Sequence, residues 1–413
     1  MTAAESLAGL RRRYRSFGDQ HLSLDMTRGK PCPQQLDLSR DMLSLDYRAL
    51  LQTPSKIDCR NYGVLEGLPE ARELFAEYMG VEPEQILIGS NSSLSLMHDT
   101  IVRALYFGVP GRNTPWKDLS NIKFLCPVPG YDRHFAICER FGIQMIPVAM
   151  LDDGPNMEEV ESMVSADPYI KGIWCVPQYS NPTGVTFSDN VVKRLACMTT
   201  AADDFRIFWD NAYAVHHLTD NPTPLLNILN ACTSVDNSNR VFLFGSTSKI
   251  TCAGSGISMF AGSAENIAWF RTHMAIQTIG HDKVNQRRHV LFLRSMDGIR
   301  AHMLKHAEIL RPKFEAVQRI LTQEFSTDGI TEWSNPKGGY FVSLNTPSQC
   351  ASKTVSLAAE IGVKLTPAGA AFPYHDDPMN RQIRIAPSFP SCEEVEKAIE
   401  VVAVCSKIAA INR

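Results

Sequence analysis

Val241-Phe-Leu-Phe-Gly-Ser-Thr-Ser-Lys249 is the stretch that decides the fold of this 413-residue chain. It opens with four apolar residues that show no polar alternation, which is typical of a strand buried on both faces of a sheet. Glycine and small hydroxyl residues then mark the end of that strand. The segment therefore predicts a buried strand whose carboxyl end carries Ser246, Ser248 and Lys249.

Six other apolar segments between residues 85 and 261 have the same character. They alternate with helical patterns, which is the signature of a mainly parallel sheet covered by helices. We therefore predict an α/β fold with a mainly parallel seven-stranded sheet and helices on both of its faces. The six further predicted strands are 85–89, 122–126, 144–148, 172–176, 206–209 and 257–261.

The C-terminal part predicts a small α+β domain, because short strands and helices there follow a long helical segment. We expect residues 282–323 to be that helical segment and to connect two domains. The predicted division is a large domain of 46–300 and a small domain of 1–45 with 301–413. Within the small domain we expect strands at 340–344 and 382–385 and helices at 354–360 and 392–408.

The N-terminus has the basic run Arg11-Arg-Arg13, which resembles part of a transit peptide. Acidic residues lie close to it, however, and Leu7, Leu10, Tyr14 and Phe17 have helical spacing. We therefore favour an ordinary amphipathic helix at this end of the chain.

Composition excludes several classes of protein. The formal net charge is −3 and the pI is near 6.4, which argues against nucleic-acid binding. No apolar run approaches the length of a membrane span. The eleven cysteines show no paired spacing, so neither a metal site nor a disulfide framework is expected. Scattered cysteines such as Cys126 indicate buried reduced thiols and a cytoplasmic protein.

Polar residues follow shortly after several predicted strands, and ligands of open α/β sheets bind at the carboxyl ends of strands. A lysine deprotonated in a dry site condenses with an aldehyde, so Lys249 is a candidate nucleophile rather than a solvated surface residue. Asp210 follows Phe208-Trp209 and needs a partner, for which a protonated pyridine nitrogen is suitable. A helix N-cap is the other interpretation of this aspartate.

The other candidates fit the remaining groups of a pyridine ring that carries an aldehyde, a phenolic oxygen and a phosphate. Asn181 and Tyr213 supply donors for the phenolic oxygen, although Asn181-Pro-Thr-Gly184 is also an ordinary turn sequence. Gly89-Ser-Asn-Ser-Ser-Leu94 opens a helical pattern, where backbone N–H groups bind phosphate. These residues together indicate a pyridoxal-phosphate enzyme.

Three more residues complete the predicted site. Tyr131 is placed to stack on a flat ring, Arg384 is a bidentate partner for a carboxylate, and Gly29 permits close backbone approach. A packing tyrosine and a structural ion pair are the alternative interpretations. The histidines have no ligand spacing, and we interpret the following as packing or surface residues: His98, His134, His216 and His217.

Motifs along nearly the whole chain resemble the fold-type-I pyridoxal-phosphate enzymes, specifically the class I/II aminotransferases. Within them, the chain looks most like type 1c aspartate aminotransferases, which are related to the aminotransferase-like half of MocR-type regulators. The matching strings are Gly29-Lys-Pro31, Tyr62-Gly-Val-Leu-Glu-Gly-Leu-Pro-Glu-Ala-Arg72, Pro127-Val-Pro-Gly-Tyr131, Asn181-Pro-Thr-Gly184, Asp210-Asn-Ala-Tyr213, Ser246-Thr-Ser-Lys249, Pro336-Lys-Gly-Gly-Tyr340 and Arg384.

The resemblance implies a role for each matching residue. Lys249 would carry the cofactor as a Schiff base and then move the substrate proton. Arg384, Asn181, Arg28 and the Gly29 backbone would bind substrate. Tyr62 would reach the phosphate of a neighbouring subunit, which implies a homodimer. The implied cofactor-binding residues are Ser90, Asn91, Ser92, Tyr131, Asn181, Asp210, Tyr213, Ser246, Ser248, Lys249 and Tyr62.

One position departs from the family pattern. The family usually has a phosphate-binding arginine eight residues after the lysine, and this chain has Ile257 there. We expect hydroxyl groups and helix N–H groups to hold the phosphate instead. If a Lys249→Ala protein still captured the aldehyde as a visibly absorbing Schiff base, the assignment of Lys249 would fail.

The resemblance makes transamination between aspartate and 2-oxoglutarate, by a ping-pong cycle, the first hypothesis. A dicarboxylic substrate needs a second cation, for which Arg28 and Lys30, with Arg133 behind them, are candidates. A C–S lyase or an aminotransferase for aromatic or other amino acids uses the same cofactor residues. A MocR-type effector-binding module is disfavoured, because only about 25 residues precede the first motif and a DNA-binding domain needs more.

Overall fold

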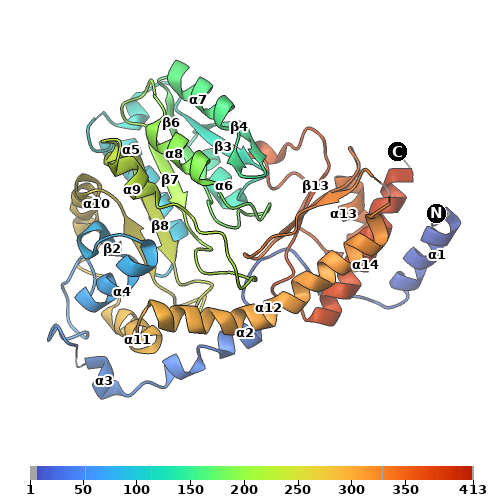
Figure 1. The fold of residues 1–413 in the computed structure, drawn as a ribbon, viewed down its shortest axis with the longest axis horizontal. Helices are drawn as coiled ribbons and strands as arrows, with labels where there is room; N and C mark the ends of the chain where they lie inside the picture. The colour runs from blue at the N-terminus through green and yellow to red at the C-terminus, as the bar shows by residue number, and fades with distance from the viewer. Residues whose placement is uncertain (1–6, 52, 113, 328, 412–413) are drawn as a thin grey trace.

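A large, mostly parallel sheet forms the centre of the molecule (Figure 1). The structure is a computed structural model and describes residues 7–51, 53–112, 114–327 and 329–411. The strand order is β2-β9-β8-β7-β6-β3-β4-β5, and the five strands from β8 to β4 run parallel. These strands are β2 Ile86–Ile88, β3 Lys123–Val128, β4 Gln144–Leu151, β5 Gly154–Pro155, β6 Ile170–Cys175, β7 Arg206–Asp210, β8 Val241–Ser246 and β9 Ser258–Ala261.

All seven predicted strands are present, which confirms the α/β fold class. Strand β9 pairs antiparallel with both of its neighbours. The two-residue strand β5 was not predicted, and it pairs antiparallel with β4 at the edge of the sheet.

Both faces of the sheet are buried, which explains why its strands are continuously apolar. Along the strands, successive side chains enter two different hydrophobic clusters: Leu125 and Ile173 belong to one, and Phe124 and Trp174 to the other. Helices α4, α7, α8 and α9 cover the first face, and α5, α6 and α10 cover the second. Their bounds are α4 Pro69–Met79, α5 Ser93–Phe107, α6 Asp132–Arg140, α7 Met157–Ala166, α8 Asp189–Cys197, α9 Ile228–Thr233 and α10 Ala264–Gln277.

A second, smaller body contains a separate hydrophobic cluster formed by residues from both ends of the chain. Its sheets are β10-β11-β13 and β1-β12, and α1 packs on α14 (Figure 1). The amphipathic helix predicted at the N-terminus is thus present as α1. The elements are α1 Leu7–Gly18, α13 Ala351–Glu360, α14 Cys392–Ile411, β1 Leu24–Asp25, β10 Glu332–Trp333, β11 Val342–Asn345, β12 Val363–Lys364 and β13 Gln382–Ile385.

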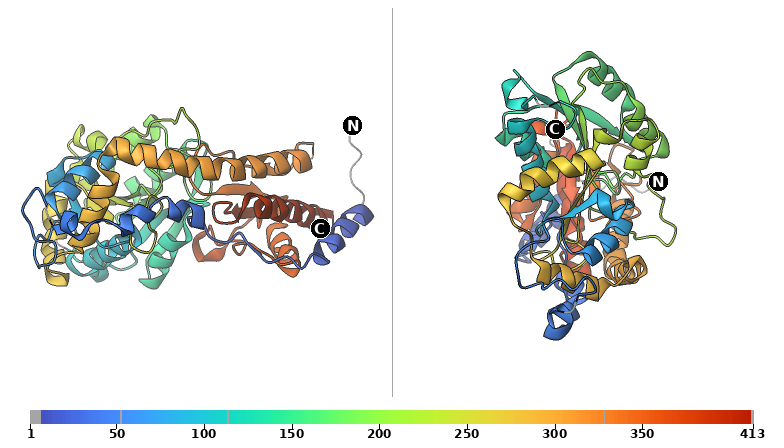
Figure 2. Two further views of the ribbon diagram at one scale, coloured as in Figure 1. Left: turned by 90° about the horizontal axis from the view of Figure 1, so that it is seen from below. Right: turned by 90° about the vertical axis from the view of Figure 1, so that its left-hand side faces the viewer.

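The two bodies are joined by α12, Met296–Phe325, which runs lengthwise past both (Figures 1 and 2). The predicted 282–323 helical segment is divided, because α11, Lys283–Leu293, ends before Arg294, which has a positive φ of 66°. Ser295 then caps α12 by accepting a hydrogen bond from the Gly298 N–H group. The predicted domain boundaries stay predictions, since α12 crosses residue 300 without a break. Two short helices, α2 Pro33–Asp37 and α3 Tyr47–Leu51, precede α4.

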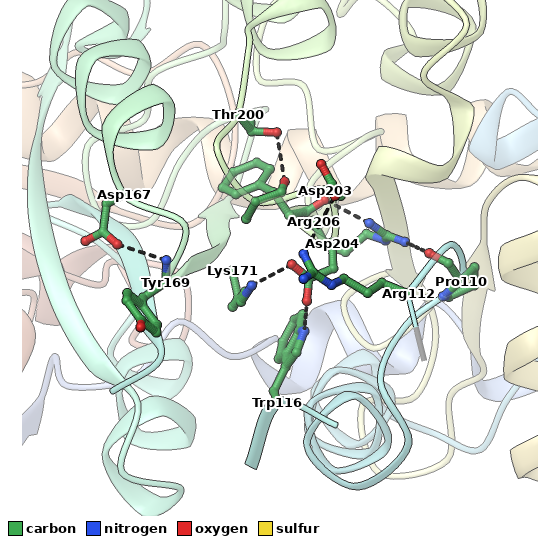
Figure 3. Close-up of polar contacts among 12 residues, drawn as sticks. Pro110, Arg112, Trp116, Asp167, Tyr169, Lys171, Thr200, Asp203, Asp204 and Arg206 are labelled. Carbon is green, nitrogen blue, oxygen red and sulfur yellow. Dashed lines mark hydrogen bonds and ion pairs between the residues drawn. The ribbon is translucent and has the colours of Figure 1, made fainter. Parts of the chain in front are cut away.

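The amino end of the sheet buries an ion pair and a guanidinium (Figure 3). Lys171, near the start of β6, donates to Asp204 Oδ1 over 2.6 Å, and Trp116 Nε1 donates to Asp204 Oδ2 over 2.9 Å. Arg206, the first residue of β7, donates to the backbone carbonyls of Phe205 and Pro110. Both oxygens of Asp204 therefore have donors, as a buried carboxylate requires.

None of the described helices is both long and apolar enough to cross a membrane. All eleven cysteines are free, and Cys126 is buried, as its apolar surroundings predict.

Candidate active site

A cavity of about 630 Å³ opens at the carboxyl end of the parallel strands, where the two bodies meet. Most of the residues predicted for the site line it, although they come from seven separate parts of the sequence. The predicted residues that line the cavity are Arg28, Gly29, Ser92, Tyr131, Asn181, Asp210, Tyr213, Ser246, Ser248, Lys249 and Arg384.

Lys249 lies three residues beyond the end of β8, and its Nζ is 4.7 Å from the centre of the Tyr213 ring. Burial lowers the pKa of its ammonium group, and the charge of Asp210 partly opposes that effect. A lowered pKa makes the neutral, nucleophilic amine more accessible near neutral pH. The Lys249 carbonyl accepts hydrogen bonds from His216 Nε2 at 3.3 Å and Tyr340 Oη at 3.5 Å, which fixes the backbone of the lysine.

Asp210 is the last residue of β7 and is 2% exposed. Its Oδ2 accepts a hydrogen bond from His134 Nε2 over 3.1 Å. Its Oδ1 is buried and has no hydrogen-bond partner among the described residues. A buried carboxylate oxygen without a donor is unfavourable, so this atom is available for a donor from a ligand.

His134, which the sequence interpretation assigned to packing or the surface, is buried and also contacts the predicted site residue Asp210. Its ring stacks on Trp174 with centroids 4.4 Å apart and an interplanar angle of 12°. This contact aims Nε2 at Asp210, while Tyr131 meets the edge of the same imidazole at 4.9 Å. The available signal was the three-residue spacing of Tyr131, the N-cap of α6, and His134, because residues at that spacing lie on the same side of a helix.

The start of α5 and the end of β8 meet in the cavity. Residues 92–94, at the N-terminus of α5, line it, as do Ser246 and Ser248. Backbone N–H groups at a helix N-terminus have no intrahelical acceptors, and they favour an anion. The same cavity is therefore lined by hydroxyl residues and by a helix N-terminus that favours an anion.

Three predicted residues do not line the cavity. Ser90 accepts hydrogen bonds at its backbone oxygen from the N–H and hydroxyl groups of Ser258. The Asn91 amide donates to the Gly254 carbonyl over 3.4 Å, and Ser248 Oγ donates to the Asn91 carbonyl over 3.2 Å. Tyr62 is 83% exposed.

Ile257 is buried immediately before β9, and its N–H group donates to Thr247 Oγ1 over 2.9 Å. The position that the resemblance associates with an arginine thus belongs to the apolar core. Arg271, the next arginine along the chain, lies 3.5 Å from Glu66 and does not line the cavity.

Arg384, the third residue of β13, also lines the cavity. Its Nη1 donates to Asp132 Oδ1 over 2.9 Å, its Nη2 donates to Thr366 Oγ1 over 3.3 Å, and its Nε is buried without a partner among the described residues. Gly29 lies against the Phe341 ring so closely that a Cβ there would be 2.4 Å from the ring. Asp132, Phe341 and Thr366 were not predicted, because their approach depends on how the two bodies pack.

Comparison with known proteins places this geometry in a family. Residues 1–413 match the sequence profile of the family described as aspartate amino-transferase. The chain is 49% identical over 401 residues to a Mycolicibacterium smegmatis protein named as an aminotransferase, covering 97% of this chain and 94% of that protein. It is 45% identical over 401 residues to an aspartate aminotransferase of Corynebacterium glutamicum, covering 97% and 93% of the two chains. The chain belongs to the aspartate aminotransferase family.

Its structure agrees with that of a relative. A crystal structure of an aspartate transaminase from Corynebacterium glutamicum matches it with a TM-score of 0.95 at 45% identity, covering 98% of this chain and 95% of that one. The predicted aminotransferase activity is therefore confirmed, and the family implies pyridoxal phosphate as the cofactor. The relation to MocR-type regulators stays a resemblance.

The cavity fits the cofactor that the aspartate aminotransferase family implies. Asp210 Oδ1 is a buried acceptor without a donor, which suits a protonated pyridine nitrogen. A buried lysine with a lowered pKa suits an aldehyde, and the N-terminus of α5 suits a phosphate. These features occur at separate points of one cavity.

Proposed function

We propose that this aminotransferase moves the amino group of L-aspartate to 2-oxoglutarate through two half-reactions that share one binding site. The single observation that carries the proposal is the convergence of Lys249, Asp210 and Arg384 in one cavity. The aspartate transaminase relatives support the choice of dicarboxylic substrates. The assignment of each residue below is part of the proposal.

Bound pyridoxal phosphate supplies an aldehyde that condenses with amines and an electron-poor ring that stabilises negative charge at the neighbouring substrate carbon. Asp210 would keep the ring nitrogen protonated through its free Oδ1, because an anion next to the nitrogen favours the cationic form. His134 would orient that carboxylate through Oδ2. Tyr131 would lie against the ring face, and Asn181 and Tyr213 would donate to the phenolic oxygen.

Lys249 would hold the cofactor between reactions and act as the proton carrier once its Nζ is released. Burial lowers the pKa of its ammonium group, which allows the amine to accept a proton from the substrate carbon. Burial raises the pKa of the Tyr213 hydroxyl well above its usual value, so that group stays a hydrogen-bond donor throughout. The Lys249 backbone stays fixed through the His216 and Tyr340 contacts while the side chain moves.

The phosphate would be held without an arginine at Ile257. The N–H groups of residues 92–94 and the hydroxyl group of Ser246 would supply the donors. Ser248 would add a further donor once its hydroxyl turns away from the Asn91 carbonyl. Ser90 and Asn91 would contribute through the backbone that shapes this turn. In a homodimer, Tyr62 of a neighbouring subunit would add one further hydroxyl, and the exposure of that side chain supports this assignment.

Substrate would be held by its carboxylates. Arg384 and the Gly29 backbone would bind the α-carboxylate beside Asn181, since guanidinium pairs with carboxylate through two parallel hydrogen bonds. Three exposed cations, Arg28, Lys30 and Arg133, line the same cavity. They would bind the distal carboxylate of aspartate or 2-oxoglutarate. We further propose that the protein acts as a homodimer and that it is cytoplasmic. The eleven free thiols support the cytoplasmic location.

A half-reaction screen tests the proposal. Purified holoprotein is mixed with each L-amino acid, and loss of the cofactor absorbance is followed in the absence of any keto acid. We expect aspartate and glutamate to convert the cofactor to its amine form fastest, and 2-oxoglutarate to reverse the change. Conversion by monocarboxylic amino acids alone would overturn the dicarboxylate assignment, and release of pyruvate and ammonia from cysteine would favour a lyase.

A further inference from the structure

Asp132 accepts a hydrogen bond from the guanidinium of Arg384, which in the proposed function binds the substrate α-carboxylate. Its Oδ1 accepts a hydrogen bond from Arg384 Nη1 over 2.9 Å, and the two side chains are 28% and 9% exposed. We propose that Asp132 competes with the substrate α-carboxylate for Arg384, so that every carboxylate ligand must displace it. This inference rests on the proposed role of Arg384 and adds a residue that sets the affinity of that site.

The remaining donors of Arg384 show why displacement is needed. Nη2 donates to Thr366, and Nη1 also lies 3.5 Å from Asn181 Oδ1, at the limit of a hydrogen bond. Nε is buried and has no partner among the described residues. A carboxylate that pairs with the guanidinium through two parallel bonds and also approaches Asn181 needs Nη1. Nη1 has two N–H groups, and Asp132 Oδ1 and Asn181 Oδ1 are the two acceptors already beside it.

The position of Asp132 allows its carboxylate to move away from Arg384. It is the first residue of α6, so its backbone is held by the helix while its side chain can rotate. The bond to Arg384 is its one side-chain hydrogen bond among the described residues. Arg28, Lys30 and Arg133 line the same cavity, and the N-terminus of α6 also attracts negative charge. A displaced carboxylate therefore stays next to positive charge.

Competition between Asp132 and a ligand carboxylate for Arg384 predicts how substitutions of Asp132 change the affinity for carboxylate ligands. Asp132→Asn removes the charge and nearly keeps the shape, so a ligand carboxylate no longer displaces an anion. We expect carboxylates to bind about tenfold more tightly, the scale of one partly exposed charge-assisted hydrogen bond. The factor is the same for monocarboxylates and dicarboxylates, because both use the Arg384 end of the cavity. An effect on the distal cations would change dicarboxylate binding alone.

Calorimetric titration of the holoenzyme with succinate and with propionate, neither of which can transaminate, tests the inference. The proteins are the parent, Asp132→Asn, Asp132→Ser as a second uncharged variant, Arg384→Gln and the Asp132→Asn/Arg384→Gln pair. Urea unfolding confirms that each variant is folded. The expected result is equal tightening for both ligands in Asp132→Asn and Asp132→Ser, and no recovery of binding by Asp132→Asn in the Arg384→Gln background.

The possible failures are distinguishable. Unchanged or weaker binding of succinate and propionate to both uncharged variants, together with weak binding to Arg384→Gln, overturns only the competition by Asp132. Tightening limited to succinate also overturns it, since that result assigns Asp132 to the distal cations. Parent-like binding to Arg384→Gln would instead overturn the role of Arg384 in the proposed function.

Discussion

Strand β7 has a buried aspartate at each end, and the two carboxylates differ in how they are satisfied. Asp204, just before the strand, is 1% exposed, and both of its oxygens accept hydrogen bonds, from Lys171 and Trp116 (Figure 3). Asp210, the last residue of the strand, is 2% exposed, yet only Oδ2 has a donor. Two equally buried aspartates therefore differ. Asp204 has all its partners within the chain, whereas Asp210 keeps one acceptor atom for a ligand.

The buried polar groups at the two ends of the sheet therefore differ in whether they have partners within the chain. At the amino end, a lysine neutralises the carboxylate and an indole donates a hydrogen bond to it, so both of its oxygens have donors within the chain. At the carboxyl end, Asp210 Oδ1 and Arg384 Nε are buried without partners among the described residues. Arg206 Nε at the amino end is also unpartnered, but that guanidinium makes two other hydrogen bonds to backbone carbonyls.

The largest expected effect on stability is at the amino end. Lys171→Met leaves Asp204 buried with only the indole as a donor, so we expect the free energy of unfolding to fall by about 3–5 kcal/mol. Urea unfolding measures the change. The double variant Lys171→Met/Asp204→Leu removes the uncompensated charge and should recover much of the loss, whereas equal instability of both variants would contradict this explanation.

The largest expected effect on activity is at the carboxyl end. Asp210→Asn removes the anion opposite the proposed ring nitrogen, so we expect kcat/KM to fall by about 10²–10³-fold, the scale of a lost preorganised electrostatic contact. The urea midpoint of the protein without cofactor should change little, because Asn still accepts from His134. An Asp210→Asn variant that lost stability but kept activity would contradict this explanation, because Asp210 would then serve the fold as Asp204 does.

A smaller loss is expected when the orienting contact alone is removed. His134→Phe keeps an aromatic ring against Trp174 but cannot donate to Asp210, so we expect kcat to fall about tenfold, as for one hydrogen bond to a charged group. His134→Gln, which retains a donor, is the matched control and should lose less. The absorbance of the bound cofactor should depend on pH in His134→Phe and not in His134→Gln. A loss of packing alone would not produce this difference.

The smallest effect is expected where Gly29 meets Phe341. Gly29→Ala places a methyl group 2.4 Å from the ring, so the ring must move and KM should rise about fivefold, in line with modest overpacking. Phe341→Leu in the same chain provides space and should restore part of the affinity. An unchanged KM in Gly29→Ala would show that the ring yields freely and that the contact does not position substrate.

The strands of the large sheet could be predicted from the sequence because their side chains are apolar on both faces. Lys249, Asp210 and Asn181 could be placed together because polar residues after parallel strands meet at one edge. His134 and Asp132 could not be assigned in this way. Their contacts join α6 to β7 and to β13, and that packing depends on residues more than 70 positions away in the chain.

Other departures have local causes. Strand β5 has only two residues, too few for a periodic pattern. The break between α11 and α12 depends on the positive φ of Arg294, which is not a residue type that marks such a conformation. The roles of all the predicted site residues stay predictions, and the side chains of Ser90, Asn91 and Tyr62 lie outside the cavity of a single chain.

The central claim is that the carboxyl edge of the sheet holds pyridoxal phosphate with Lys249 as its covalent partner. The most direct test is borohydride reduction of the holoprotein, followed by proteolysis and mass spectrometry of the peptides. The account predicts a phosphopyridoxyl group on Lys249, and none on the neighbouring cavity lysine Lys30. A label on Lys30 or on any other lysine, with Lys249 unmodified, would contradict it.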